Sequence, residues 1–241
     1  NQKLDILSVA VPNNQHRELT IAGLEAGANV LCEKPMAMNT AEAQEMLDTA
    51  ARLGLKLGID FSYRFNPQSR AMKDLVDAGR LGEIYYGRSV WLRRRGVPGL
   101  GSGFNTKGGG AGSWFFDKSQ SGGGPLIDLL HMIDLALWFM DYPEPEFVLA
   151  QTTHDFMDDP DFHGSWGSVV SATGTTDVES ACHGFVRFKT GQVLSIHNSW
   201  AELVKEEDIF VALQAKKTGV RIRCVNGQNS CELYAQKNGV S

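Results

Sequence analysis

The sequence predicts an α/β protein in which a partial parallel sheet is followed by a larger, open and mostly antiparallel sheet. Three observations support this prediction. Strand-like and helix-like patterns alternate over residues 5–61, the alternation stops after Asn66 and Pro67, and six strand-like segments follow one another from Phe147 onward. We therefore expect two domains, one formed by residues 1–66 and the other by residues 67–241.

The first domain is expected to contain three parallel strands joined by two helices. The apolar run from Asp5 to Val11 ends at Pro12, as in a strand covered on both faces. Asn39 or Thr40 is a suitable helix cap, and Gly54 is a suitable stop. The expected strands are 5–11, 30–32 and 56–61, and the expected helices are 15–27 and 39–52. Their short connections favour a parallel sheet with right-handed crossovers.

The second domain is expected to be an open sheet backed by helices. An amphipathic helix over 68–79 ends at Gly79, a long alternating strand covers 83–95, and an apolar helix covers 125–140. Gly, Asn and Asp in the later connections are typical of antiparallel hairpins. The expected later strands are 147–153, 181–188, 192–200, 208–215, 219–224 and 230–235.

Composition excludes some classes of function. The chain has 241 residues, 42% of them hydrophobic, and a net charge of −5, which argues against binding to a nucleic-acid backbone. No apolar run is long enough for a membrane span, so we expect no membrane partner. The four cysteines lack metal-type C-x-x-C spacing and are expected to be reduced thiols of a cytoplasmic protein.

Lys34 lies where an apolar strand gives way to a loop, in the segment Leu31–Pro35. Open α/β sheets bind ligands outside the carboxyl ends of their strands, and a lysine there can hydrogen-bond a substrate oxygen. The alternative is a solvated lysine in a turn. A second candidate pair, Asp128 and His131, follows a glycine run and stands three residues apart, which predicts a shared helix face. The alternative for His131 is a buried structural histidine.

Weaker signals have ordinary explanations. The segment containing His154 and His163 is rich in aspartate, but its spacing fits no metal motif, and we expect no metal site. Arg93, Arg94 and Arg95 alternate faces on a strand, where a solvated or interface role is the default. Trp114 can stack on a sugar ring or anchor its loop.

No G-x-G-x-x-G turn or Walker pattern occurs in the sequence. We therefore expect that the chain lacks the first β-α-β unit of a nucleotide-binding sheet, where phosphates would bind. At the other end, Ser241 follows a hairpin with no closing element, which is compatible with a shortened carboxyl end.

Four stretches together resemble the Gfo/Idh/MocA family of oxidoreductases. They are Asp5–Asn13 with His16, Ala26–Pro35, Tyr63–Pro67 with Gly79–Gly82, and Gly122–Asp128 with His131 and Asp134. They come in the order of the family and span nearly the whole chain. The resemblance implies a Rossmann-type first domain that binds NAD or NADP, and a second domain that binds a sugar, cyclitol or related polyol.

The resemblance also implies roles for individual residues. Lys34, Asp128 and His131 correspond to the catalytic residues of the family, with His131 as the base and Lys34 holding the reacting oxygen. The expected cofactor-binding residues are Pro12, Asn13, His16, Glu33, Lys34 and Pro35. Arg64, Trp114 and Asp134 are weaker candidates for substrate binding. A homo-oligomer, dimer or tetramer, assembled through the open sheet is implied as well.

One departure from the family concerns the catalytic segment. The aspartate and histidine of the family are usually four residues apart, whereas Asp128 and His131 are separated only by Leu129 and Leu130. A bulge that restores the geometry, a residue missing from the chain and an impaired site all remain open. Two other functions also remain open, namely an NAD-assisted lyase or glycosidase of the same fold, and a non-catalytic binding or regulatory homologue.

Overall fold

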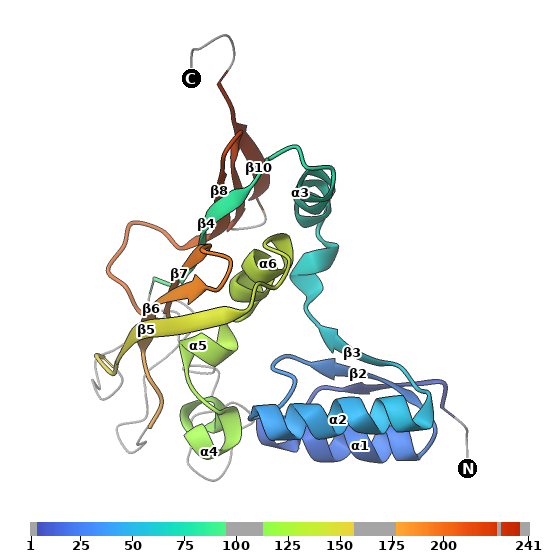
Figure 1. Ribbon diagram of the computed structural model, residues 1–241. Coiled ribbons are helices and arrows are strands. Elements are labelled where there is room, and N and C mark those ends of the chain that lie inside the picture. Colours follow the sequence, from blue (N-terminus) through green and yellow to red (C-terminus); the bar gives the residue numbers. More distant parts are fainter. Residues whose placement is uncertain (1–3, 95–112, 157–176, 226–227, 237–241) are drawn as a thin grey trace.

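A computed structural model of the chain describes residues 4–94, 113–156, 177–225 and 228–236 (Figure 1). It contains two sheets, which confirms the predicted α/β fold class. The first sheet has three parallel strands in the order β1-β2-β3, and the second has seven strands in the order β10-β9-β8-β4-β7-β6-β5.

The first sheet is built as the apolar runs predict. Its strands are β1 (Ile6–Val9), β2 (Asn29–Glu33) and β3 (Leu57–Asp60), and its helices are α1 (His16–Glu25) and α2 (Thr40–Leu53). Both helices lie on the same face of the sheet (Figure 1). The core between these helices and the sheet is formed by Val9, Leu24, Val30, Cys32, Met46 and Ala50.

Helix α2 begins and ends where its sequence predicts. The Asn39 side chain accepts a hydrogen bond from the Glu42 backbone N–H, at 3.0 Å, and so caps the first turn. Gly54 closes the helix in the left-handed conformation, with φ of 64°, which glycine adopts at little steric cost.

The second sheet is mostly antiparallel, as expected, with one parallel pair at its centre. The pair consists of β4 (Ile84–Leu92) and β7 (Val193–Ser199), with Leu92 opposite Ser199. The other strands are β5 (Pro145–Thr153), β6 (Ala181–Phe188), β8 (Asp208–Ala215), β9 (Gly219–Val225) and β10 (Gln228–Tyr234). Because β4 and β7 run in the same direction, their carboxyl ends meet at one edge of the sheet.

Helices α3 (Pro67–Asp77) and α6 (His131–Phe139) pack on one face of the second sheet (Figure 1). Leu135 and Phe139 of α6 are fully buried in the same core cluster as Leu194 and Leu213 of the sheet. Burial of each such side chain contributes roughly 1.5–3 kcal/mol. The described part of the chain places no helix over the opposite face, which carries a smaller apolar cluster of Val90, Phe210 and Ala212.

The predicted helix over 125–140 is wrong in one respect, since the structure has two helices there. Helix α5 (Pro125–Asp128) ends at Asp128, and α6 begins at His131. Leu129 has ψ of 33° and departs from the helical path. Asp128 and His131 therefore lie on different helices instead of sharing one helix face.

The remaining described helices are only three or four residues long. They are α4 (Lys118–Ser121) and the 3-10 turns Asn13–Gln15, Ser62–Phe65 and Ser113–Phe116. The turn Ser62–Phe65 and its neighbour Asn66 connect the first sheet to α3. None of the described helices is long and apolar enough to cross a membrane.

Candidate functional site

A cavity of about 610 Å³ lies at the carboxyl ends of β1 and β2. This volume is within the usual range for small-molecule sites, roughly 300–1,000 Å³. One wall comes from the first sheet and the other from the segment that includes α4 and α5. The lining residues are Ala10, Val11, Pro12, Asn13, Glu33, Lys34, Pro35, Trp114, Phe115, Gln120, Ser121, Gly123, Ile127 and Asp128.

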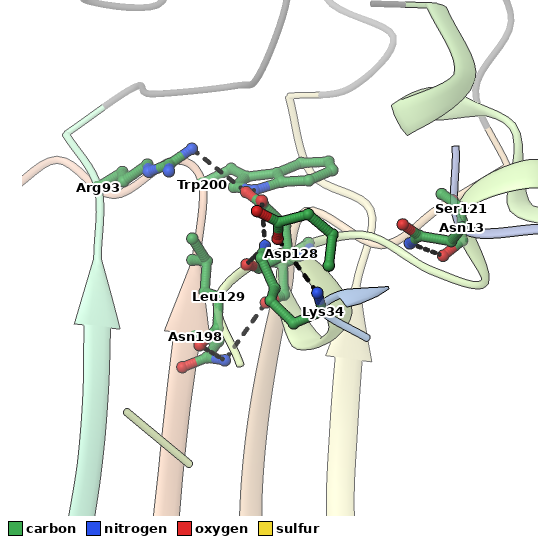
Figure 2. Close-up of polar contacts among 10 residues, drawn as sticks. Asn13, Lys34, Arg93, Ser121, Asp128, Leu129, Asn198 and Trp200 are labelled. Atoms are coloured by element: carbon green, nitrogen blue, oxygen red, sulfur yellow. Dashed lines mark hydrogen bonds and ion pairs between the residues drawn. The ribbon is translucent and has the colours of Figure 1, made fainter. Parts of the chain in front are cut away.

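The first wall contains most of the residues predicted to bind the cofactor. Pro12 and Asn13 follow β1, and Lys34 and Pro35 follow β2, joined by a cis peptide bond. The Asn13 side chain is buried and donates a hydrogen bond to the Ser121 carbonyl oxygen at 2.7 Å (Figure 2). This bond links the loop after β1 directly to α4 on the other wall.

His16 lies behind the cavity and does not line it. It is fully buried, and its two ring nitrogens lie 2.7 Å from the Pro35 carbonyl oxygen and 2.9 Å from the Val11 carbonyl oxygen. The imidazole therefore connects the loops that follow β1 and β2. His16 therefore holds the two loops in place and does not contact the cavity.

Lys34 reaches across the cavity to Asp128. Its Nζ donates a hydrogen bond to the Asp128 main-chain oxygen at 2.7 Å and lies 3.5 Å from Asp128 Oδ1 (Figure 2). The side chains are 17% and 11% exposed, so water screens this ion pair only weakly. An ammonium group has three N–H donors. Two of them face Asp128, which leaves one for a ligand oxygen.

The interruption between α5 and α6 produces the second wall. In a continuous helix, the carbonyls of Asp128 and Leu129 would accept hydrogen bonds from residues four positions later. Here Lys34 Nζ binds the Asp128 carbonyl, and Asn198 Nδ2 of β7 donates to the Leu129 carbonyl at 3.2 Å. The interruption therefore exposes a main-chain oxygen that anchors Lys34.

His131, the expected base, lies beside this pair within an aromatic cluster. Its ring centroid is 4.8 Å from that of Tyr63 and 6.1 Å from those of Phe61 and Trp91. Burial and, to a smaller extent, the positive charge of Lys34 lower the pKa of His131 to about 4, although Asp128 acts in the opposite direction. His131 is thus neutral at pH 7 and is not among the residues that line the cavity.

Arg64 and Asp134, two weaker candidates, form an ion pair away from the cavity lining. Arg64 Nε donates to Asp134 Oδ2 at 2.7 Å, and Nη2 binds both Asp134 Oδ1 and the Tyr142 hydroxyl. The pKa of Asp134 is raised, because the effect of burial is larger than the opposing effect of the Arg64 charge and hydrogen bond. The pair connects the turn Ser62–Phe65 to α6.

Trp114, the third weaker candidate, lines the cavity and stacks on Phe115 with ring centroids 3.9 Å apart. The acidic segment from His154 is only partly described, because residues 157–176 lie outside the described residues. Within the described ranges, no group of three or more metal-ligating side chains is gathered.

Three residues of the site were not predicted from the sequence. They are Trp200 and Arg93, which contact the Asp128 carboxylate, and Asn198, which contacts the Leu129 carbonyl. The strand predicted over 83–95 ends at Leu92, so Arg93 is the first residue beyond it. Trp200 is the first residue beyond β7. The available signal was that both residues follow neighbouring strand ends.

Two family models match the chain. One is described as an oxidoreductase family with an NAD-binding Rossmann fold and matches residues 1–61, and the other is the GFO/IDH/MocA C-terminal domain and matches residues 69–228. Among curated proteins, D-glucoside 3-dehydrogenase of Escherichia coli K12 is 36% identical over 98% of this chain and 62% of its own length. A putative UDP-kanosamine synthase oxidoreductase subunit of Amycolatopsis mediterranei is 29% identical over 94% of this chain and 60% of its own length.

Solved structures show the same fold. A levoglucosan dehydrogenase in complex with NADH and levoglucosan superposes with a TM-score of 0.73 at 21% identity, over 96% of this chain and 61% of that protein. The chain therefore spans about three fifths of the length of the relatives that it matches.

Proposed function

The chain belongs to the GFO/IDH/MocA oxidoreductase family, and on this premise we propose that it is an NAD(P)-dependent oxidoreductase. The proposed reaction transfers a hydride between a nicotinamide cofactor and a secondary hydroxyl of a sugar, cyclitol or related polyol. The observation that carries the proposal is the contact between Lys34 and Asp128 in a cavity at the carboxyl ends of two parallel strands. This is where open α/β sheets bind ligands.

The residues of the first wall fit the nicotinamide end of NAD or NADP. The cavity combines apolar surfaces from Pro12, Pro35 and Ile127 with a few fixed polar groups, the pattern of a cofactor site. Asn13 is held by Ser121, so its position does not depend on the ligand. We assign cofactor binding to Pro12, Asn13, Glu33, Lys34 and Pro35, with His16 supporting their loops.

When bound, the cofactor supplies the hydride acceptor or donor, and the protein supplies orientation and proton transfer. Lys34 has one N–H donor left, and it holds the reacting oxygen of the substrate. His131 is neutral at pH 7 because of its lowered pKa, so it can accept the proton of the hydroxyl. Asp128 keeps Lys34 in place through its main-chain oxygen and its carboxylate.

The relatives favour a pyranose substrate. One of them is named a D-glucoside 3-dehydrogenase, and a structural neighbour holds levoglucosan, also a six-membered sugar ring. We propose a glucoside-like pyranose as the substrate class. Trp114 on the cavity wall offers an aromatic face for such a ring.

We also propose that residues 1–66 and 67–241 are separate domains and that copies of the protein associate through the uncovered face of the second sheet. Seven strands about 4.8 Å apart and about 24 Å long give a face of roughly 800 Å². A standard stable interface buries about this area on each partner. Leu149 and Phe185 also lie on this face and are exposed in the single chain.

A cytoplasmic location is proposed from the cysteines. Cys32, Cys182, Cys224 and Cys231 all carry free thiols in the structure. Burial raises the pKa of Cys224 to about 11, which keeps this thiol protonated. Free cysteines are usual in a reducing compartment.

The test of the proposed function combines binding and turnover. Calorimetry with NADH and NADPH measures cofactor affinity, and turnover is followed with methyl D-glucoside and levoglucosan. Net accumulation of reduced nicotinamide supports the dehydrogenase. Product formation without net reduction favours the NAD-assisted lyase or glycosidase, and absence of cofactor binding favours the non-catalytic homologue.

A lysine variant makes this test specific. Lys34→Met is expected to lower turnover by about 10²–10⁴-fold, the usual contribution of a proton-transfer or oxygen-binding group. Lys56→Met, an exposed lysine before β3, is the matched control and should retain the activity of the parent protein. Equal turnover in both variants would remove Lys34 from the mechanism.

A further inference from the structure

The Asp128 carboxylate is held by two donors, which directly follow the carboxyl ends of the neighbouring strands β4 and β7. Trp200 Nε1 donates to Asp128 Oδ2 at 2.9 Å, and Arg93 Nη1 lies 3.3 Å from the same oxygen (Figure 2). The other oxygen, Oδ1, faces Lys34 Nζ at 3.5 Å. The two oxygens of one carboxylate therefore have different partners from different parts of the molecule.

Strand register explains why Arg93 and Trp200 meet. Strands β4 and β7 are parallel neighbours, and Leu92 is opposite Ser199. Arg93 and Trp200 are the next residue on each strand, so they leave the sheet side by side. The Arg93 backbone N–H donates to the Ser199 carbonyl oxygen at 2.9 Å, which extends the pairing by one residue and fixes the origin of the guanidinium.

Burial makes these contacts strong. Trp200 is fully buried, and the side chains of Arg93 and Asp128 are only 15% and 11% exposed. An indole N–H in such a place has no water to bind, and hydrogen bonds to an ionised acceptor are stronger than neutral ones. The arrangement therefore fixes one orientation of the Asp128 carboxylate.

We propose that Arg93 and Trp200 are positioning residues that occupy Oδ2 and hold the Asp128 carboxylate in one orientation, so that Oδ1 and the main-chain oxygen orient Lys34. This inference rests on the proposed function, because it gives Lys34 the reacting oxygen. The contribution of Asp128 is to hold the Lys34 ammonium with one N–H donor directed at the substrate.

Kinetics of three variants test the proposal in the intact protein, with methyl D-glucoside as substrate. Arg93→Gln and Trp200→Phe each remove one donor to Oδ2 and are expected to lower kcat by at least about tenfold, with the KM for the nicotinamide cofactor unchanged. Arg93→Lys keeps the charge and should recover part of kcat. Arg94→Gln is the matched control, since the adjacent Arg94 is exposed and directed elsewhere.

The split between kcat and KM separates positioning from a general structural effect, because a general loss of structure would also raise the KM for the nicotinamide cofactor. Folded Arg93→Gln and Trp200→Phe variants with the kcat of the parent protein would overturn the proposal.

A spectroscopic measurement distinguishes failure of this inference from failure of the proposed function. The indole N–H resonance of Trp200 is the one lost in Trp200→Phe, and it should shift in Asp128→Asn and in Arg93→Gln but not in Arg94→Gln. If these shifts occur while no sugar is turned over, the carboxylate contacts stand and the proposed function fails. If sugar is turned over but Asp128→Asn leaves the resonance in place, the proposed function stands and this inference fails.

Discussion

The protonation of His131 depends on its surroundings more than on its position in the sequence. The imidazole is packed among Phe61, Tyr63 and Trp91, and burial is the main reason that its pKa falls from 6.5 to about 4. A histidine on an apolar helix can be recognised from sequence as a candidate base. Its pKa cannot be predicted from sequence, because all three rings come from residues at least 40 positions away in the chain.

The lowered pKa predicts how stability depends on pH. The unfolded chain binds the proton near pH 6.5 and the folded protein only near pH 4, so His131 favours the folded state fully above pH 6.5. This stabilisation, ~3 kcal/mol, is lost as the pH falls from 6.5 to about 4. Denaturant unfolding at pH 7 and near pH 4 should show the loss in the parent protein and less of it in His131→Phe. An NMR midpoint for His131 near 6.5 would contradict the prediction.

At the scale of elements, the segment from Gly122 to Phe139 shows what local sequence can and cannot predict. The apolar pattern predicts helix over 125–140, and helix is present over most of it. At the interruption, Lys34 and Asn198, which lie far away in the sequence, bind the main-chain oxygens of Asp128 and Leu129. Local propensity gives no sign of such tertiary partners. For the same reason the cavity wall formed by this segment could not be derived from sequence.

Asn198 should be required for the interruption between α5 and α6. It is fully buried, and its Nδ2 donates to the Pro125 and Leu129 carbonyl oxygens at 3.3 and 3.2 Å. Asn198→Ala leaves a buried carbonyl without a donor and is expected to lower the free energy of unfolding by about 1–3 kcal/mol. Gln151→Ala, at an exposed position on β5, is the control for denaturant unfolding. An equal midpoint for the two variants would argue against this role.

Gly124 should not accept a side chain, because the chain before β6 passes directly over it. A Cβ at Gly124 would lie 2.1 Å from the Glu179 main-chain oxygen, whereas a Cβ at Gly58 would meet only Leu31 Cδ1 at 3.4 Å. Gly124→Ala is expected to lower the free energy of unfolding by about 1–3 kcal/mol, as in other overpacked sites. Gly58→Ala should have a smaller effect in the same measurement. Similar losses in both variants would show that the segment over Gly124 moves easily.

At the scale of the whole molecule, polar contacts within the described residues join the first sheet and the turn after it to the rest of the protein. Lys34 contacts Asp128, Asn13 contacts Ser121, and Arg64 contacts Asp134. The strands, their order of appearance and the position of Lys34 after β2 could be predicted from apolar runs and turn residues. The contacts that Lys34, Asn13 and Arg64 make with residues of the second part of the chain could not be predicted, because they depend on how the two sheets are placed relative to each other.

The face of the second sheet over which the described residues place no helix leads to a prediction about assembly. Leu149 on the edge strand β5 is opposite Phe185 and is 72% exposed, so lysine can replace it without disturbing the fold of one copy. If copies associate through this face, Leu149→Lys introduces a charge that must lose water on association, at a cost in affinity. Leu203→Lys is the matched control, since Leu203 is 79% exposed and lies in the connection between β7 and β8. Sedimentation should then show an oligomer for the parent protein and for Leu203→Lys, and a smaller species for Leu149→Lys. A parent protein that sediments only as a monomer would contradict association through this face.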